Sequence, residues 1–299
     1  MMHSSQTSPT IPTRISVSPT SPEKSSAEKT TFRLSDANYY SREANKHYMS
    51  VTVFKRFLAC EAEALAELKG IWVPERDPTA LLAGNYLHSY FESPEAHQSF
   101  IDAHPEMFST RGSTKGQLKS AYKVAESMIQ ALKDDPSFQA AYQGNKEEIL
   151  TGEINGVKWM GKLDCFDPAR AFFLDLKTTQ DLHKRYWIQD DDRGHWGSFV
   201  EAYNYPLQMA VYQELIRQNY GTRPAPILVA VSKQDPPDKA FVAIPQDDLD
   251  EAMQELMDAQ QRIEQVIAGE ISPYRCEQCD YCRSTKHLGQ IISMNDLID

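Results

Sequence analysis

The arrangement of apolar and polar residues changes near residue 147, from patterns typical of helices to patterns typical of strands. On the N-terminal side, Ser50 is a suitable N-cap for a helix that runs through Leu68 and ends at Gly70. Further helices are predicted at 79–92 and 115–133. This part of the chain is therefore expected to be helical.

The middle of the chain has the alternation and turn signals of a three-stranded meander. Strands are predicted at 147–154, 157–166 and 171–177. The Asn155-Gly156 pair between the first two strands is a strong signal for a two-residue hairpin. Asp167-Pro168 predicts the next turn, so the three strands are expected to pair in chain order.

The remaining elements complete an α/β pattern. A helix is predicted at 199–219, strands at 226–232 and 240–244 around Pro236-Pro237, and a last helix at 246–268. This last helix places an apolar stripe on one face, made of Leu249, Met253, Leu256, Ile263 and Ile267. The order of elements predicts a sheet covered by helices.

The N-terminal 34 residues differ from the rest in composition. They are rich in Ser, Thr and Pro and hold few large apolar groups. Such a segment cannot bury enough surface to offset its ordering entropy, so 1–34 is predicted to be a disordered tail. The folded domain is predicted to cover 35–290, with a short tail at 291–299.

Bulk composition limits the class of protein. Hydrophobic residues make up 41% and charged residues 24%, which is typical of a soluble globular chain. No apolar run approaches the ~18 residues of a membrane span, and the N-terminus lacks the pattern of a secretory signal, so a cytoplasmic protein is expected. The formal net charge of −11 excludes binding of nucleic acid through bulk positive charge. DNA binding would need a local basic patch, a metal ion or enclosure of the strand.

Two aspartates and a lysine form the candidate catalytic group. Asp175 and Lys177 share one face of a strand, because side chains alternate, while Leu176 points to the other face. Pairing across the Asp167-Pro168 turn can bring Asp164 beside Asp175. Paired carboxylates suit a hard divalent cation such as Mg2+, which lowers the pKa of a bound water. Lys177 would hold the attacking water or stabilise charge that develops at phosphorus.

An alternative interpretation of this triplet is a solvated strand face. A D-x-K or E-x-K triplet arises by chance about once or twice in a chain of this length. Glu67-Leu68-Lys69 is another example, without a partner aspartate. Glu148 and Glu153 precede the motif strand and could add a carboxylate to the site.

The cysteines form a ligand pattern. There are five, and Cys276, Cys279 and Cys282 have C-x2-C-x2-C spacing within a cluster segment at 275–287. An odd number in an intracellular chain argues against a disulfide framework. A closed zinc site or a four-iron cluster needs a fourth ligand, for which Cys60 is the first candidate and His287 a substitute. Zinc, iron–sulfur and no metal remain open, and Cys165 is expected to be a buried small hydrophobe.

Four short motifs carry a family resemblance. They are Gly84-Asn85-Tyr86-Leu87-His88, Gly161-Lys162-Leu163-Asp164, Asp175-Leu176-Lys177-Thr178-Thr179 and Gln208-Met209-Ala210-Val211-Tyr212. In this order they resemble the G-x-x-x-H, G-x-x-D, D-x-K-T and Q-x-x-x-Y motifs of the RecB-type branch of PD-(D/E)xK nucleases. The sequence is most similar to phage exonuclease VIII (RecE-like) proteins. The resemblance spans 35–290 and implies a restriction-endonuclease-like fold with a mixed central sheet.

The resemblance also implies residue roles. His88, Asp164 and Asp175 would be metal ligands, joined by the backbone carbonyl of Leu176. Lys177 would be the catalytic lysine. Gln208 and Tyr212 would position the substrate backbone, although such a helical pair is more often a packed face.

The function that the resemblance implies is that of a Mg2+- or Mn2+-dependent exodeoxyribonuclease. It would act on double-stranded DNA ends and expose 3′ single strands for an annealing protein in phage recombination, in a bacterial cell. Ring-forming relatives thread the duplex through a channel, and the candidate lining residues here are Lys115, Lys119, Lys123, Lys184 and Arg185. A solvated helix face is the alternative for the first three.

The segment from Ser50 to Cys60 resembles the early serine–aromatic–cysteine segment of iron–sulfur RecB-type nucleases. In those relatives, one early cysteine joins three late ones. The late spacing here is shorter than is usual in that family. Two other functions therefore stay open. One is a non-catalytic DNA-binding or accessory protein that retains the nuclease fold, and the other is a redox or structural protein that acts through its cysteine cluster.

Overall fold

A computed structural model describes residues 32–75, 77–189, 193–289, 291 and 293–297. Residues 1–31 of the predicted N-terminal tail lie outside this range. Leu34–Asp299 forms one compact unit by itself. Among the described residues, none of the helices has the length and apolar character that a membrane-spanning segment requires.

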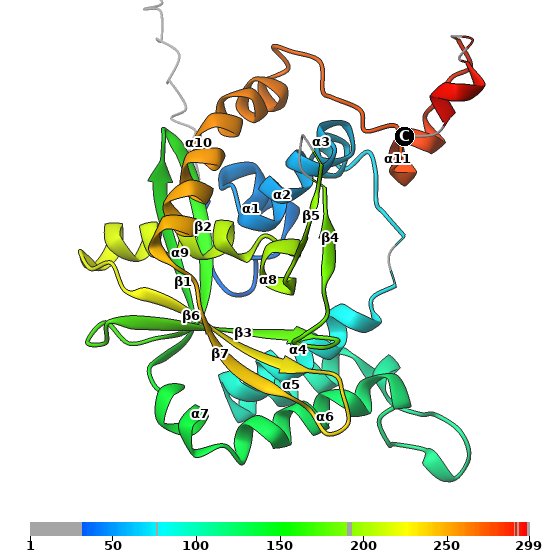
Figure 1. The fold of residues 1–299 in the computed structure, drawn as a ribbon. Helices are drawn as coiled ribbons and strands as arrows, with labels where there is room; N and C mark the ends of the chain where they lie inside the picture. Colours follow the sequence, from blue (N-terminus) through cyan, green and yellow to red (C-terminus); the bar gives the residue numbers. More distant parts are fainter. Residues whose placement is uncertain (1–31, 76, 190–192, 290, 292, 298–299) are drawn as a thin grey trace, which may run out of the picture. The chain divides into compact units, whose positions relative to one another are not determined.

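A five-stranded mixed sheet forms the centre of this unit, in the order β1-β2-β3-β6-β7 (Figure 1). Its strands are β1 (Asn145–Ile154), β2 (Val157–Phe166), β3 (Phe172–Thr179), β6 (Ala225–Ser232) and β7 (Lys239–Ala243). Neighbours are antiparallel except β3 and β6, which are parallel. The mixed sheet predicted from the sequence is confirmed.

The hairpin between β1 and β2 fixes the register of the site strands. Asn155 and Gly156 both have positive φ, at 48° and 82°, as a type I′ turn requires. Ile154 therefore pairs with Val157, and the same register continues to Asn145 and Phe166.

Helices pack on both faces of the sheet and enclose two cores. One core joins β2 and β6 to α2 (Val51–Ala59), α9 (Tyr205–Tyr220) and α10 (Gln246–Ala268). The other joins β3 and β6 to α4 (Thr79–Glu92), α6 (Ser120–Lys133) and α7 (Pro136–Ala141). Figure 1 shows α9 and α10 on the opposite side of the sheet from α6 and α7. Burial on both faces explains why β6 is an almost continuous apolar run.

Several predicted helices have different limits in the structure. The helix predicted from Ser50 is divided at Cys60, whose extended backbone separates α2 from α3 (Glu61–Lys69). The helix predicted at 199–219 is divided into α8 (Phe199–Ala202) and α9, with Asn204 in the left-handed region at φ 47°.

The prediction that Lys115, Lys119 and Lys123 share one face of a helix was wrong. The helix α6 begins at Ser120, and a short 3-10 helix, η2 (Gly112–Thr114), precedes it. Lys115 and Lys119 therefore lie before the helix, and only Lys123 lies within it. Gly116, with φ 80°, places a turn between them.

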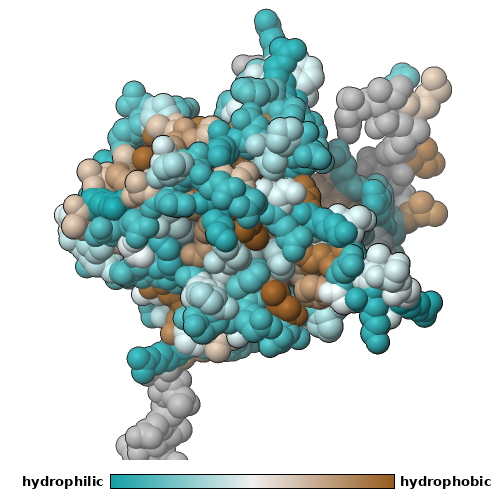
Figure 2. Space-filling view, turned by 90° about the horizontal axis from the view of Figure 1, so that it is seen from below, coloured by the Kyte–Doolittle hydropathy of each residue, from teal (hydrophilic) through white to brown (hydrophobic). Residues whose placement is uncertain are grey.

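The structure also contains short elements that the sequence did not predict. Besides η2 and α7, they are α1 (Arg42–His47), α5 (Pro94–Ala103), η1 (Pro105–Met107), β4 (Tyr186–Ile188), β5 (His195–Gly197), α11 (Asp280–Ser284) and η3 (Met294–Leu297). Figure 2, which views the molecule from the side of α6 and α7, shows a largely hydrophilic surface with small separate hydrophobic clusters. That surface agrees with the amphipathic pattern of α6, whose apolar side faces the sheet.

Candidate active site

The predicted site residues come together in one cavity of about 650 Å³. Its lining includes all the side chains expected from the nuclease motifs: His88, Asp164, Asp175, Lys177, Gln208 and Tyr212. They come from the consecutive strands β2 and β3 and from two helices distant from them in the sequence, α4 and α9. The meeting of four motifs at one place is the first structural evidence for a functional site.

The strands β2 and β3 separate at this cavity. Their paired positions end at Cys165 with Leu174, so Asp164 and Asp175 come next, where the ladder has opened. The carboxylate of Asp164 enters the gap and accepts a hydrogen bond from the Leu176 backbone N–H at 2.6 Å. The bond satisfies a buried donor of β3 and fixes the direction of the carboxylate.

The side chains of Asp175 and Lys177 form an ion pair on one face of β3, as the alternation of the strand predicts. Gln208 donates to Asp175 Oδ1 at 3.2 Å and lies 3.1 Å from the Tyr212 hydroxyl. Lys177 Nζ lies 4.9 Å from the ring centroid of Tyr205. The Asp175 oxygen that pairs with Lys177 is Oδ2, which is buried.

Glu147 is a site residue that the sequence analysis missed. Lys146 pairs with Cys165 and Glu148 with Leu163, so Glu147 falls opposite Asp164. Its Oε1 lies 3.9 Å from His88 Nδ1, and Asp164 Oδ2 lies 3.4 Å from the same nitrogen. The register counted from the Asn155-Gly156 turn was the signal that could have identified it.

The two glutamates considered from the sequence have other partners. Glu148 accepts hydrogen bonds from Asn145 and from the hydroxyl of Tyr220, away from the cavity. The backbone of Glu153 exchanges hydrogen bonds with Gln218. Neither lines the cavity, so the extra carboxylate comes from Glu147.

The carboxylates and cations alter one another's protonation. Burial favours the neutral form of Asp164, but His88 and the Leu176 N–H outweigh it and hold the pKa of this carboxyl below its usual range. Burial also disfavours the charged imidazole of His88, yet Asp164 and Glu147 raise its pKa to about 10. Without a metal ion, a protonated His88 therefore balances part of the carboxylate charge.

Burial shifts the pKa of two neighbouring groups, Asp175 and Lys55, but is outweighed at a third, Lys177. It raises the pKa of Asp175 to about 6, with the nearby charge of Asp164 acting in the same direction. For Lys177, burial is outweighed by Asp175 and Asp164, which raise its pKa. On α2, burial and the charge of Lys177 lower the pKa of Lys55 to about 8. At neutral pH, Lys177 is thus a charged hydrogen-bond donor.

The donor set fits a divalent cation. Potential ligand atoms of His88, Glu147 and Asp164 all lie within 4.8 Å of one another. Mg2+ with ligands at about 2.1 Å separates them by about 3.0 Å when adjacent and about 4.2 Å when opposite. The Asp175 carboxylate on the adjoining strand, whose Oδ2 pairs with Lys177, offers a further oxygen. Small side-chain movements would bring these groups around one ion.

The four cysteines singled out from the sequence also converge, at a separate place. Cys60, Cys276, Cys279 and Cys282 form a group whose sulfur atoms lie within 4.8 Å of one another. His287 is not part of this group, and Cys165 is buried elsewhere, beside Lys146.

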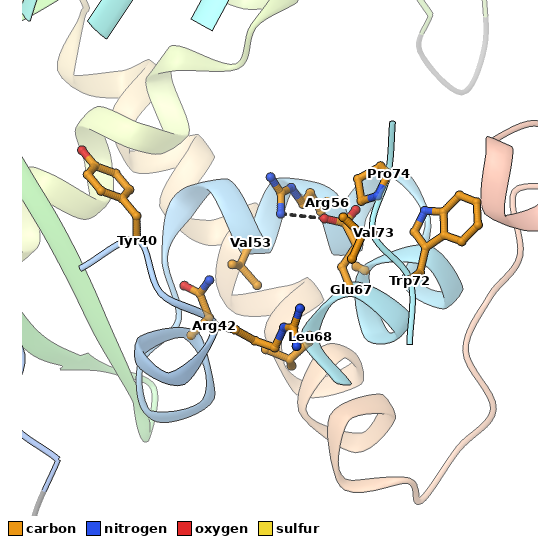
Figure 3. Close-up of a pocket in the computed structure, with 11 residues that line it drawn as sticks. Tyr40, Arg42, Val53, Arg56, Glu67, Leu68, Trp72, Val73 and Pro74 are labelled. Atoms are coloured by element: carbon orange, nitrogen blue, oxygen red, sulfur yellow. Dashed lines mark hydrogen bonds and ion pairs between the residues drawn. The ribbon is translucent and has the colours of Figure 1, made fainter. Parts of the chain in front are cut away.

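Another cavity, shown in Figure 3, is lined by residues of α1, α2, α3 and the segment that follows α3. Its volume is about 270 Å³. The carboxylate of Glu67 in its wall is held by Arg56 at 2.8 Å. It therefore lacks the converging carboxylates of the larger cavity.

None of the five predicted channel residues lies on either cavity wall described above. Lys184 Nζ lies 5.0 Å from the ring centroid of Tyr186, and the guanidinium of Arg185 lies 5.5 Å from that of Trp196. Their aromatic neighbours belong to the β4–β5 hairpin.

Comparisons with known proteins agree with this geometry. A family described as "PDDEXK-like domain of unknown function (DUF3799)" matches residues 50–285. The crystal structure of a Eubacterium rectale protein described as a "putative exonuclease" superimposes with a TM-score of 0.82 and 36% identity, over 90% of this chain and 99% of that chain.

Two other comparisons give no information about the family of this chain. The structure of SSO0001 has 13% identity and a TM-score of 0.29, over 77% of this chain and 91% of that one, which is too little similarity for any argument. No curated protein matches the sequence. The family match covers most of the chain and all four motifs that converge in the cavity, so this chain belongs to the PDDEXK-like DUF3799 family within the PD-(D/E)xK nuclease superfamily.

Proposed function

We propose that this protein is a metal-dependent deoxyribonuclease whose active site is the cavity around Asp164, Asp175 and Lys177. The observation that supports this most is the opening of β2 and β3, which places Asp164, Asp175 and Lys177 around one space with His88 and Glu147. Nothing in a structural sheet requires so many buried charges to converge. Such groups are costly to bury unless they bind an ion or a charged substrate.

His88, Glu147, Asp164 and Asp175 would hold Mg2+ or Mn2+, with the Leu176 carbonyl beside them. When bound, the ion would lower the pKa of a water molecule and neutralise phosphate charge. The Leu176 N–H keeps the Asp164 carboxylate oriented before the ion arrives. Binding would require His88 to lose the proton that Asp164 and Glu147 favour in the metal-free protein.

Lys177 would act as a donor and not as a base. Asp175 and Asp164 raise its pKa, so its ammonium stays protonated at neutral pH. From its position it would orient the attacking water and stabilise negative charge on the phosphate as the bond from water oxygen to phosphorus forms and the ester bond breaks. Gln208 would hold Asp175 in place, with Tyr212 supporting Gln208.

DNA binding by a chain of net charge −11 must be local. Lys55 and Lys162 line the same cavity as Lys177, so phosphate would meet three lysines where carboxylates and metal also lie. Lys162 Nζ lies 3.1 Å from Glu147, which gives it a role in positioning that carboxylate as well.

The Eubacterium rectale relative is described as a "putative exonuclease", and that description supports proposing exonuclease activity for this chain. The substrate would be a duplex DNA end, and digestion of one strand would expose a 3′ single strand for an annealing protein. Assembly into a ring around the duplex, in a bacterial cell carrying a phage or prophage, would complete this function.

The activity is tested with linear duplex labelled at either end, a covalently closed circle of the same sequence, and Mg2+. The proposal expects release of nucleotides from the linear DNA by wild type and loss of this activity in Asp175→Ala and Lys177→Ala. An intact closed circle would identify the enzyme as an exonuclease. DNA binding without cleavage in several divalent metals would instead support a non-catalytic accessory protein.

A further inference from the structure

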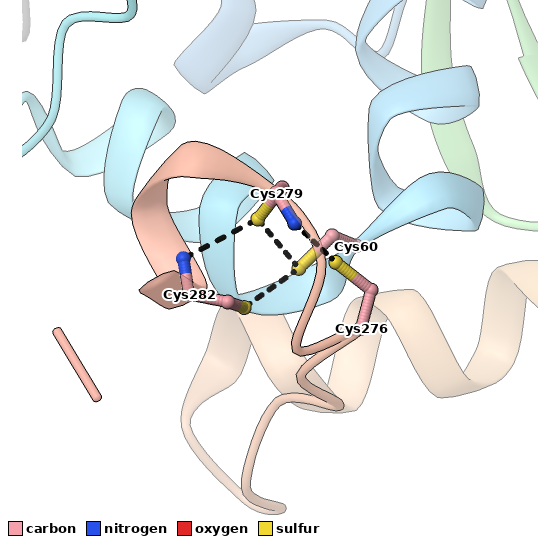
Figure 4. A group of neighbouring side chains, drawn as sticks. All are labelled: Cys60, Cys276, Cys279 and Cys282. Carbon is pink, nitrogen blue, oxygen red and sulfur yellow. Dashed lines mark hydrogen bonds between the residues drawn. The ribbon is translucent and has the colours of Figure 1, made fainter. Parts of the chain in front are cut away.

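The cysteine group joins two segments that lie more than two hundred residues apart in the chain. Cys60 lies between α2 and α3, while Cys276, Cys279 and Cys282 lie before and within α11. Cys60 Sγ lies 3.5 Å from Cys282 Sγ and 3.7 Å from Cys279 Sγ, across sequence separations of 222 and 219 residues. Figure 4 shows the four side chains pointing toward one common point.

These separations distinguish between the two kinds of metal group. A single zinc ion with four thiolates at about 2.3 Å places neighbouring sulfur atoms about 3.8 Å apart. In a four-iron cluster, each cysteine binds a different iron at the surface of the cluster, so the four sulfurs must stand wider apart than around one ion. All four sulfurs here lie within 4.8 Å of one another. The iron–sulfur cluster suggested by the family resemblance does not fit this spacing.

We propose that Cys60, Cys276, Cys279 and Cys282 bind one zinc ion in a closed tetrahedral structural site. Closed four-cysteine sites leave no position open for substrate, so this ion would stabilise the fold and take no part in hydrolysis. The site is separate from the cavity that holds Asp164 and Asp175, and it does not depend on the proposed nuclease activity.

The backbone around the cysteines is arranged to support thiolates. Cys279 N–H donates to Cys276 Sγ at 3.2 Å, and Cys282 N–H donates to Cys279 Sγ at 3.4 Å. Glu277 has a positive φ of 60°, which turns the chain between the first two cysteines. Arg275 donates to the Cys282 carbonyl at 2.8 Å and places positive charge beside the group. Such outer contacts orient metal ligands and partly offset their negative charge.

The ion would act as a clasp between the C-terminal segment and the helices next to the catalytic cavity. Cys60 ends α2, the helix that carries Lys55 into that cavity. A second connection runs beside the cysteines: Arg262 holds Glu61 at 2.7 Å, and Tyr274 N–H donates to the same carboxylate at 2.6 Å. Loss of zinc would therefore release residues 276–285 first and loosen α2 and α3 next.

Metal content of the full-length protein tests the proposal. The protein is purified without oxygen from cells supplied with both iron and zinc, and iron, zinc and acid-labile sulfide are measured. The expected result is about one zinc per chain with no visible absorbance. Iron with sulfide, or protein that holds no metal, would overturn the proposal.

Three variants give the matched comparison. Cys276→Ala should lose zinc and become sensitive to proteolysis after residue 269. Cys276→His should keep zinc, because histidine is a usual zinc ligand, and Cys165→Ser should keep it because Cys165 lies outside the group. Zinc retained in Cys276→Ala would contradict the assignment. If Cys276→Ala does not fold, chelation of wild type gives the same information: zinc release must accompany proteolysis of the C-terminal segment.

Discussion

The ring of Tyr212 lies directly against Gly161, so the tyrosine of one family motif occupies the space that the glycine of another leaves open. A Cβ atom added at Gly161 would lie 2.9 Å from two carbons of that ring. Gly161 is on β2, three residues before Asp164, and Tyr212 is on α9 and lies 3.1 Å from Gln208. The contact therefore couples the position of β2, which carries Asp164, to that of α9, whose Gln208 donates a hydrogen bond to Asp175.

Gly161→Ala should therefore destabilise the protein by about 1–3 kcal/mol, because the added carbon pushes Tyr212 and α9 away from the sheet. The rate of DNA cleavage should also fall under conditions where the variant is fully folded, because Gln208 would move with the helix and release Asp175. The control is Gly84→Ala, where an added Cβ comes no closer than 4.0 Å to its neighbour, Thr178 Oγ1, and alanine favours the helix. The measurement is the free energy of unfolding of both variants in urea. Equal values for Gly161→Ala and Gly84→Ala would refute the coupling between Gly161 and Tyr212.

Glu147→Gln should weaken metal binding about 10–100-fold, because it removes one charged oxygen from the proposed ligand set. Glu148→Gln is the neighbouring control, since Glu148 turns toward Asn145 and Tyr220. The measurement is the Mg2+ concentration that gives half-maximal cleavage. A larger effect from Glu148 than from Glu147 would mean that the register of β1 at the site is wrong.

Lys55 should contribute to DNA binding only below about pH 8, because burial and the charge of Lys177 lower its pKa to that value. Below that pH, Lys55→Met should bind duplex more weakly than wild type, and the dependence of affinity on salt should fall by about one phosphate contact. Above it, the variant and wild type should converge. Lys46→Met, whose exposed ammonium pairs with Glu43, is the control. A difference that stays constant across pH would contradict this role.

His88 should stabilise the metal-free protein at low pH and lose that effect in alkali. Its folded pKa of about 10 lies above the ordinary 6.5, so the folded state binds the proton more tightly than the unfolded chain does. The stabilisation is complete below 6.5 and disappears as pH rises through about 10. With EDTA present, the difference in unfolding free energy between wild type and His88→Gln should be largest near about pH 6 and should decrease steadily toward about pH 10. A difference that increases with pH would show that Asp164 and Glu147 do not act on His88 as described.

Local signals predicted much of the site from the sequence. The turn at Asp167-Pro168 and the alternation of β3 were enough to place Asp164 near Asp175 and Lys177. Glu147 was missed because adjacent acidic residues look equivalent until strand register separates their faces. Only counting from the hairpin turn distinguishes Glu147 from Glu148.

Other differences arose where tertiary contacts override local preference. The predicted helix from Ser50 is interrupted at Cys60, whose backbone is extended where its sulfur meets the distant C-terminal cysteines. The lysines at 115 and 119 have helical spacing, but the chain turns at Gly116 and the helix starts only at Ser120. The short β4–β5 hairpin carries too few residues for a clear periodic signal.

The proposed activity depends on the carboxylates gathered where β2 and β3 open, which would hold the metal ion needed for DNA hydrolysis. Single-turnover cleavage of end-labelled duplex, measured with increasing Mg2+, tests it most directly when wild type is compared with Asp164→Asn and Glu148→Gln. Asparagine can still accept the Leu176 N–H but lacks the charge, so the rate should fall about 100-fold or more while the fold persists. Glu148→Gln should cleave like wild type. Cleavage by Asp164→Asn at the wild-type rate, with the same Mg2+ dependence, would contradict the claim.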